Sequence, residues 1–190
     1  MMSTSMSTPM PMSEPAPPPE PLVEAVDVVD VVDVADFRRA VGHFASSVTV
    51  VTTSAHGIDH AMTASAFTSV SLEPLLVLVC VDKDARFRDA VLESGSWGVS
   101  VLASGQRLAA DWFAMKGRPL IGQLDRFPAH RGVTGAPLLD GALSWLECRT
   151  SAVYDGGDHD IVVGAVIAAL EGDRDGQPLV HHRGHYGRLA

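Results

Sequence analysis

Residues 154–164 place two glycines and an Asp-His pair between two runs of apolar, largely β-branched residues. Gly156 and Gly157 permit backbone angles that residues with a Cβ resist, as a tight β-hairpin requires. We therefore predict two antiparallel strands joined here, with Asp158 and His159 presented at the strand ends. His159 is then placed to face a ligand. A solvated hairpin tip is the alternative, and for a lone Gly-Asp-His triplet it is the stronger one.

Length and composition favour one folded domain. The chain has 190 residues, of which 46% are hydrophobic, enough for one substantial core. Its net charge of −9 arises in the first 36 residues, which hold seven acidic and no basic side chains, whereas the remainder carries 16 acidic against 14 basic ones. The rest of the chain is therefore nearly neutral. This argues against a nucleic-acid-binding protein, whose basic residues cluster on one face.

The cysteines and the hydropathy bear on the cellular compartment. Cys80 lies in the run LLVLVCV and Cys148 in SWLECRT, surroundings that are typical of buried free thiols. The start of the chain has no apolar signal-peptide segment. The longest apolar run, residues 75–81, is far shorter than the roughly 20 residues of a membrane-spanning helix. We predict a cytoplasmic protein that does not bind membranes.

The first 35 residues differ in composition from the rest. Met, Ser, Thr, Pro and Glu dominate up to about residue 24, and Val-Val-Asp repeats follow to residue 36. Such a segment buries too little apolar surface to offset the entropy of ordering it. We predict that residues 1–35 form a disordered, acidic and proline-rich tail, acting as a solvated linker or a docking handle. Residues 36–190 are predicted to form the folded domain.

Strand signals dominate the predicted domain. Runs rich in β-branched residues predict strands at 47–53, 62–71, 75–81, 96–102, 142–154 and 160–170. Helical spacing predicts a helix capped by Asp36 with Phe37, Ala40, Val41 and Phe44 on one face, a second with Phe87, Ala90 and Val91 ending at Gly95, and a third with Leu108, Trp112 and Met115 ending at Gly117. The strands follow too closely for parallel crossovers throughout, and no GxGxxG follows any of them. We therefore predict a closed antiparallel barrel with helices at its ends.

Small and hydroxyl-bearing side chains gather in residues 62–71, where Thr63, Ser65 and Thr68 alternate irregularly with Ala and Val. An ordinary half-exposed strand explains this composition. The alternative is a ligand site, in which small side chains let a flat ring approach the backbone. Hydroxyls and free amides at the strand ends would then hold phosphate or ring carbonyls.

The C-terminal segment, residues 178–189, holds three histidines, two arginines and a tyrosine around two glycines. It is a metal site, an anion site or a solvated terminus. The adjacent His181 and His182 would point to opposite faces of a strand, which makes metal the weaker functional option. Arg183 is able to hold a phosphate or an adenine-bearing ligand, and Tyr186 to stack on a ring.

Taken together and in order, four segments resemble one family: FRRAVGHFASSVTVVTT, MTASAFTSVSLEPLLVLVCVDK, GAPLLDGALSWLECRTSAVYDGGDHDIVVGAV and PLVHHRGHYGRL. They are similar to the short-chain NAD(P)H:flavin reductases, the reductase components of two-component flavin monooxygenases. The resemblance covers residues 37–189. It implies a mainly β fold, namely a six-stranded antiparallel Greek-key split barrel with flanking helices, which binds flavin and forms a homodimer.

The resemblance also implies roles for individual residues. His159 would be the catalytic residue, facing the nicotinamide in a positioning and electrostatic role. The implied cofactor-binding residues are Met62, Thr63, Ser65 and Ala66 at the flavin ring and ribityl chain, Cys80, Val81, Asp82, Lys83, Arg86 and Phe87 toward the phosphate, Trp112 and Phe113 bordering the dinucleotide, and Arg183 and Tyr186 closing the pocket. No metal is implied. Three positions depart from the family pattern: Ala66 replaces a common serine, Leu75 a proline, and Ser46-Ser47 a frequent Thr-Gly.

The implied function is the transfer of a hydride from NADH or NADPH to FMN or FAD, with reduced flavin passing to a separate monooxygenase. Hydride transfer needs stacked rings and donors near the flavin pyrimidine edge, but no nucleophile. The sequence agrees, since it has no GxSxG or HExxH motif. The alternatives are a flavin-binding electron carrier or sensor without turnover, and a metal-binding protein that uses His159 and the C-terminal histidines. The choices of flavin, nucleotide and oxygenase stay open at this level.

Overall fold

The predicted hairpin is present, and it joins the two longest strands. In the computed structural model, which describes residues 32–189, strands β9 (Ser144–Gly156) and β10 (His159–Glu171) pair in antiparallel register. Gly157 has φ = +81°, the left-handed angle that a type II′ loop needs at its first position. The loop therefore consists of Gly157 and Asp158, and β10 begins at His159.

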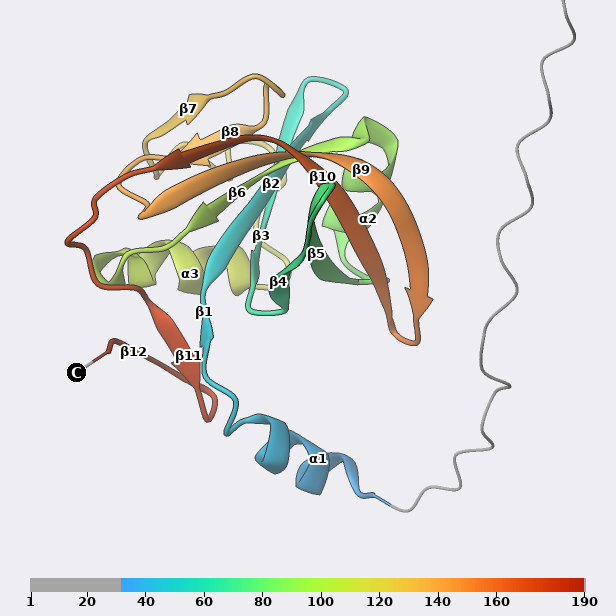
Figure 1. The fold of residues 1–190 in the computed structure, drawn as a ribbon, viewed down its shortest axis with the longest axis vertical. Helices are drawn as coiled ribbons and strands as arrows, with labels where there is room; N and C mark the ends of the chain where they lie inside the picture. Colours follow the sequence, from blue (N-terminus) through green and yellow to red (C-terminus); the bar gives the residue numbers. More distant parts are fainter. Residues whose placement is uncertain (1–31, 190) are drawn as a thin grey trace, which may run out of the picture.

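Seven antiparallel strands form the main sheet, in the order β3-β2-β6-β9-β10-β5-β4 (Figure 1). The remaining strands are β2 (Thr49–Ala55), β3 (Ile58–Ala64), β4 (Phe67–Leu72), β5 (Leu75–Asp82) and β6 (Ser96–Val101). Its two edge strands, β3 and β4, are consecutive in the chain and separated by Ser65 and Ala66. The sheet must therefore curl until both edges reach this corner. The predicted antiparallel, mainly β fold is confirmed, with seven strands in the main sheet where six were expected.

Two predicted strands are divided in the structure. The segment 47–53 splits into β1 (Ser46–Ser47) and β2, and β1 joins a separate sheet with β11 (Val180–His182) and β12 (His185–Gly187). The segment 62–71 splits at the Ser65–Ala66 corner, because the chain passes there from one edge of the main sheet to the other. A short ribbon of β7 (Ala129–Arg131) and β8 (Pro137–Leu139) completes the β structure described for residues 32–189.

The helices flank the sheet, and two of them differ from the prediction. Helix α1 (Val34–Val41) begins before Asp36, because the carboxylate of Asp33 caps it by accepting from the Ala35 amide at 2.6 Å. Helix α2 (Arg86–Ser94) lies where expected. Helix α3 (Arg107–Ala114) follows a 3-10 turn, η1 (Ser104–Gln106), and ends before the predicted Gly117. The predicted tail falls in residues 1–31, outside the described residues, apart from the last few positions. No helix in the described part is long and apolar enough to cross a membrane.

The buried faces of helices α3 and α1 also differ from those predicted from the spacing of apolar residues. Helix α3 packs Ala109, Ala110 and Phe113 into the core, whereas Leu108 on the face predicted from spacing is exposed. Small alanines let the helix approach the sheet closely, so the packed face consists of two alanines and Phe113, and the larger Leu108 stays outside it. Helix α1 buries none of its residues, so its apolar face has no partner among residues 32–189.

Trp97 organises the main core cluster. It is fully buried together with Val79, Val99 and Cys148, and burial raises the pKa of the Cys148 thiol to about 12. This confirms Cys148 as a buried free thiol, whereas Cys80 is only partly buried. A Cβ at Gly164 would lie 2.4 Å from the Trp97 ring, so only glycine fits on β10 at this point. The indole therefore packs directly against the strand that carries His159.

Replacing Gly164 by alanine should destabilise the fold by about 1–3 kcal/mol, because the new methyl group overpacks the Trp97 ring. Thermal unfolding followed by circular dichroism measures the change. Gly105→Ala is the matched control, since a Cβ at Gly105 meets nothing within 4 Å. A Gly164→Ala protein as stable as the parent would contradict this account of the core.

Candidate functional site

Two cavities lie beside the Ser65–Ala66 corner. The first, here the corner cavity, has a volume of about 640 Å³ and is lined mainly by small residues, including Ser46, Ser47, Ser65, Ala66 and Cys80. The second, here the loop cavity, has a volume of about 390 Å³; its lining includes Met62, Thr63, Asp82, Arg86, Phe87 and Phe113. Both volumes are in the range of small-molecule sites. The structure thus gathers most of the predicted residues around one corner of the sheet.

Hydrogen bonds to backbone carbonyls hold the corner and the adjoining end of β3 against β5 and α3. The Cys80 amide donates to the Ala66 carbonyl at 3.0 Å, which ties the corner to β5. The hydroxyl of Thr63 donates to the Ala110 carbonyl of α3 at 2.7 Å. The hydroxyl proton of Thr63 is thereby used in packing rather than left free for a ligand, whereas Ser65 and Ala66 are exposed at the cavity wall.

Strand β5 contributes to both cavities through alternate residues. Cys80 lines the corner cavity and Asp82 the loop cavity, because residues two apart on a strand face the same way. Val81 lies between them, points to the opposite face and is fully buried in the core. The side chain of Val81 is therefore not available to a ligand. Of the predicted run of three residues, two reach the cavities.

His159 lies directly beside Asp82, because these two residues are paired in the β10–β5 ladder. Paired residues of an antiparallel ladder place their side chains on the same face of the sheet. The ring Nδ1 of His159 is 2.7 Å from Oδ1 of Asp158, within hydrogen-bond distance at the exposed hairpin end. The hydrogen bond from the Asp84 amide lowers the pKa of Asp82, and the charges of Lys116 and His159 lower it further.

Six predicted residues line neither cavity in this chain: Val81, which is buried in the core, His159, which lies beside Asp82, and Lys83, Trp112, Arg183 and Tyr186. Lys83 forms an ion pair with Asp155 of β9, and the Trp112 indole donates to the Gln123 carbonyl at 2.8 Å. Arg183 lies at the β11–β12 turn beside His43, and Tyr186 lines a separate cavity of about 380 Å³ with Arg107. The expectation that these last two close the same pocket is therefore not met within a single chain. Among residues 32–189, no three His, Cys, Asp or Glu side chains are grouped to hold a metal ion.

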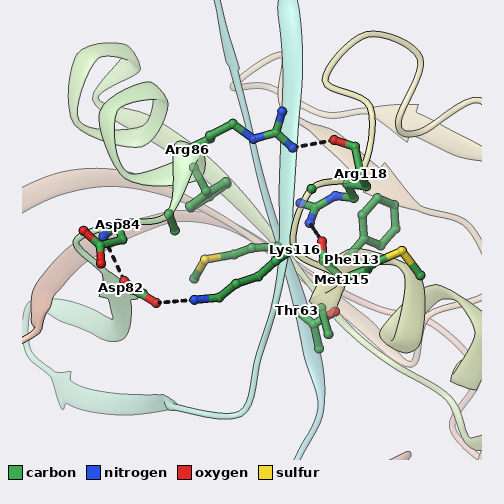
Figure 2. A pocket seen from close by; sticks show the side chains of 13 residues that line it. Thr63, Asp82, Asp84, Arg86, Phe113, Met115, Lys116 and Arg118 are labelled. Carbon is green, nitrogen blue, oxygen red and sulfur yellow. Dashed lines mark hydrogen bonds and ion pairs between the residues drawn. The ribbon is translucent and has the colours of Figure 1, made fainter.

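Sequence reasoning missed the residues that follow α3. Lys116 and Arg118 line the loop cavity, and the Lys116 ammonium reaches across it to Asp82 at 3.5 Å (Figure 2). Asp84 lines the same cavity and was missed too. The signal that could have found the two cations is the run Met-Lys-Gly-Arg, which places them on either side of a glycine turn.

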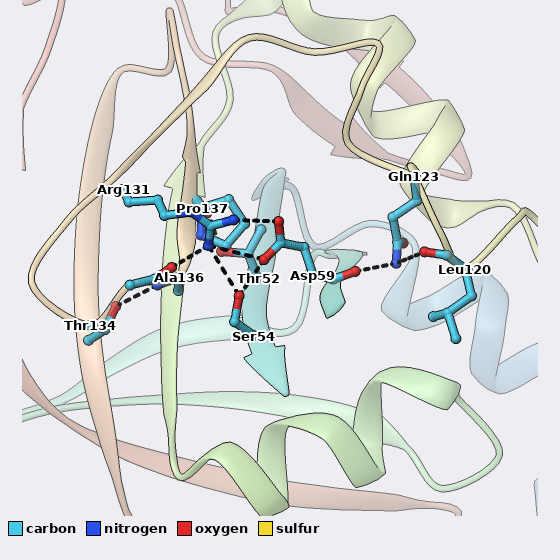
Figure 3. A network of polar contacts seen from close by, with 10 residues as sticks. Thr52, Ser54, Asp59, Leu120, Gln123, Arg131, Thr134, Ala136 and Pro137 are labelled. Carbon is cyan, nitrogen blue, oxygen red and sulfur yellow. Dashed lines mark hydrogen bonds and ion pairs between the residues drawn. The ribbon is translucent and has the colours of Figure 1, made fainter. Parts of the chain in front are cut away.

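A polar network fastens this loop to β3. The buried Gln123 amide donates to the Asp59 carbonyl at 2.8 Å (Figure 3), and Arg118 donates to the Gln123 side chain at 3.1 Å. Arg118 also donates to the carbonyls of Ala61 and Met115, the second at 2.9 Å. The loop is thus held in place by interactions with backbone carbonyls, which places Lys116 at the cavity mouth.

The comparisons with known proteins agree with one another. The family model of the flavin reductase like domain matches residues 41–190. The chain is 46% identical over 134 residues to an NADH-dependent FAD reductase of Streptomyces globisporus, covering 70% of this chain and 73% of that protein.

Two solved structures share the fold. BorF, the flavin reductase component of a bacterial two-component tryptophan halogenase, superposes with a TM-score of 0.78 at 47% identity, covering 83% of this chain and 98% of that one. The NADH:FAD oxidoreductase SgcE6 of Streptomyces globisporus, in complex with NAD and FAD fragments, superposes with a TM-score of 0.79 at 39% identity, covering 87% of this chain and 98% of that one. The chain therefore belongs to the flavin reductase-like domain family, and its activity is that of a flavin reductase, an oxidoreductase.

Proposed function

We propose that this protein oxidises NADH, reduces FAD or FMN, and passes the reduced flavin to a separate flavin-dependent oxygenase. The observation that carries the proposal is the juxtaposition of three features: the Ser65–Ala66 corner between β3 and β4, Asp82 on β5, to which the corner is bonded, and His159 on the adjacent β10. The related reductases support NADH as the donor, and BorF supports an oxygenase or halogenase as the partner.

The residues at the corner fit a flavin. The corner cavity is about 640 Å³ in volume, and its wall is formed by short side chains such as Ser46, Ser47, Ser65 and Ala66. Short side chains leave the backbone accessible to a flat ring system, and hydroxyls offer hydrogen bonds to its polar edge. When bound, the flavin supplies a ring that accepts a hydride from the nicotinamide.

The protein groups then have to bind and orient the two ligands. The corner is held to β5 by the Cys80 amide, so its shape is set before a ligand arrives. His159 is placed beside Asp82 by the β10–β5 ladder, and its ring contacts Asp158 at the hairpin end. The role assigned to His159 is to position the nicotinamide side of the site and to stabilise developing charge.

We also propose that the protein acts as a homodimer. The β4–β5 hairpin exposes Val70, Leu72 and Leu75 to solvent, and the apolar face of α1 has no partner within the described part of the chain. Contiguous exposed apolar side chains mark association surfaces. A second copy that covers both surfaces would also bring its own Arg183 and Tyr186 to the assembly, which is one way for these residues to reach a shared site.

Purified protein should oxidise NADH only when FMN or FAD is added, as followed by absorbance at the nicotinamide band. His159→Ala should lower kcat by about tenfold or more, while the affinity for flavin changes little. The matched control is His130→Ala, a histidine of similar side-chain exposure (44% against 40%) that is also paired with a carboxylate. Bound flavin without NADH oxidation would indicate a carrier or sensor instead. Equal turnover of the His159→Ala protein and its parent would remove the role assigned to His159.

Ser65→Phe should abolish flavin binding, because the ring would occupy the corner cavity that small side chains leave open. Ser65→Ala keeps the space and removes one neutral hydrogen bond, which costs on the order of 1 kcal/mol of binding free energy at most. Quenching of flavin fluorescence measures both affinities. Retention of parental affinity by Ser65→Phe would show that flavin binds elsewhere.

Leu72→Glu should convert the dimer to a monomer, because it places a charge at an apolar contact. Leu72 is 85% exposed in the single chain, so the substitution leaves the core untouched. Leu108→Glu on α3, where leucine is 78% exposed, is the control and should leave the assembly intact. Light scattering coupled to size-exclusion chromatography gives both masses. A parent protein that is already monomeric would refute the dimer.

A further inference from the structure

Lys116 stands apart from the other cations of the loop cavity. Its side chain is 90% exposed, and it extends across the cavity mouth toward Oδ2 of Asp82 (Figure 2). By contrast, Arg118 donates to two backbone carbonyls and to Gln123, and Arg86 donates to the Arg118 carbonyl at 2.6 Å. The two arginines therefore hold the loop, whereas the ammonium of Lys116 makes an exposed ion pair.

The partner of Lys116 is itself fixed. Oδ1 of Asp82 accepts from the Asp84 amide at 2.8 Å, which locks the carboxylate in the turn before α2. Oδ2 is left facing Lys116 at 3.5 Å. Exposed pairs of this kind contribute little to stability, so the lysine is released at small cost. Its flexible four-carbon stem allows the ammonium to move to another anion within the same cavity.

The carboxylates around the loop cavity explain why a phosphate bound there would require a nearby cation. Asp82 and Asp84 line the loop cavity and would repel a phosphate. A lysine that neutralises Asp82 in the free protein, and contacts the phosphate when a ligand binds, removes part of this repulsion. Charge-assisted hydrogen bonds from an ammonium to phosphate oxygens are among the stronger ones in proteins.

We propose that Lys116 is a phosphate-binding residue of the loop cavity, and that it exchanges the carboxylate of Asp82 for the phosphate of the bound ligand. The proposal rests on the proposed function, because both of its ligands, the flavin nucleotide and the nicotinamide dinucleotide, carry phosphate. The shared chemistry is a phosphate group held at the mouth of the cavity. Which of the two ligands supplies it is decided by the experiment.

The test is the steady-state kinetics of Lys116→Gln with NADH and either FMN or riboflavin, which lacks the phosphate. If the flavin supplies the phosphate, KM for FMN rises about tenfold and KM for riboflavin is unchanged. If the dinucleotide supplies it, KM for NADH rises about tenfold with either flavin. All three KM values within about twofold of the parent, or equal increases for FMN and riboflavin, would overturn the proposal.

Two further variants separate a lost contact from a damaged fold. Lys116→Arg keeps the cation and should restore most of the affinity for the phosphate-bearing ligand. Arg174→Gln removes an exposed charge (79% against 90% for Lys116) that pairs with Glu171 and lines neither cavity, so it should leave all KM values unchanged. If the parent fails to oxidise NADH, the proposed function fails. In that case the ratio of FMN to riboflavin affinity, from fluorescence quenching, still tests Lys116.

Discussion

The pairing of β5 with β10 is the constraint on which the site depends. This ladder sets His159 opposite Asp82 and Ile161 opposite Cys80. A shift by one residue would turn Cys80 and Asp82 into the core and Val81 out of it, because side chains alternate along a strand. The buried valines of β5 and the Trp97–Gly164 contact oppose such a shift, so core packing and the geometry of the site are set by the same register.

The corner at Ser65 and Ala66 has a second structural role. Two edge strands of a seven-stranded sheet meet there, and the chain crosses from one to the other without a long loop. The short side chains at the corner are exposed, and they leave a cavity open beside the backbone. The same point of the chain therefore joins the two edges of the sheet and lines the candidate site.

Much of this arrangement could be predicted from the sequence, because it is encoded in local patterns. The Gly-Gly-Asp-His hairpin, the strand of residues 75–81 and the helix that ends at Gly95 depend on turn chemistry and periodicity. The division of residues 62–71 could not be predicted, since it depends on where the sheet closes. Lys116 and Arg118 were missed because hydrogen bonds to distant backbone carbonyls bring their loop to the cavity. The positions of Arg183 and Tyr186 likewise depend on the separate small sheet of β1, β11 and β12, whose pairing between distant segments cannot be predicted from a local pattern.

The central claim is that a flavin ring lies against the corner of this sheet with His159 beside it. A crystal structure of the protein with bound FMN tests this claim most directly. The account predicts density for the ring against the backbone of residues 63–66, with the His159 side chain on the neighbouring hairpin facing the same site. Density for the ring beside Tyr186 and Arg107, with the corner cavity filled by solvent, would contradict it.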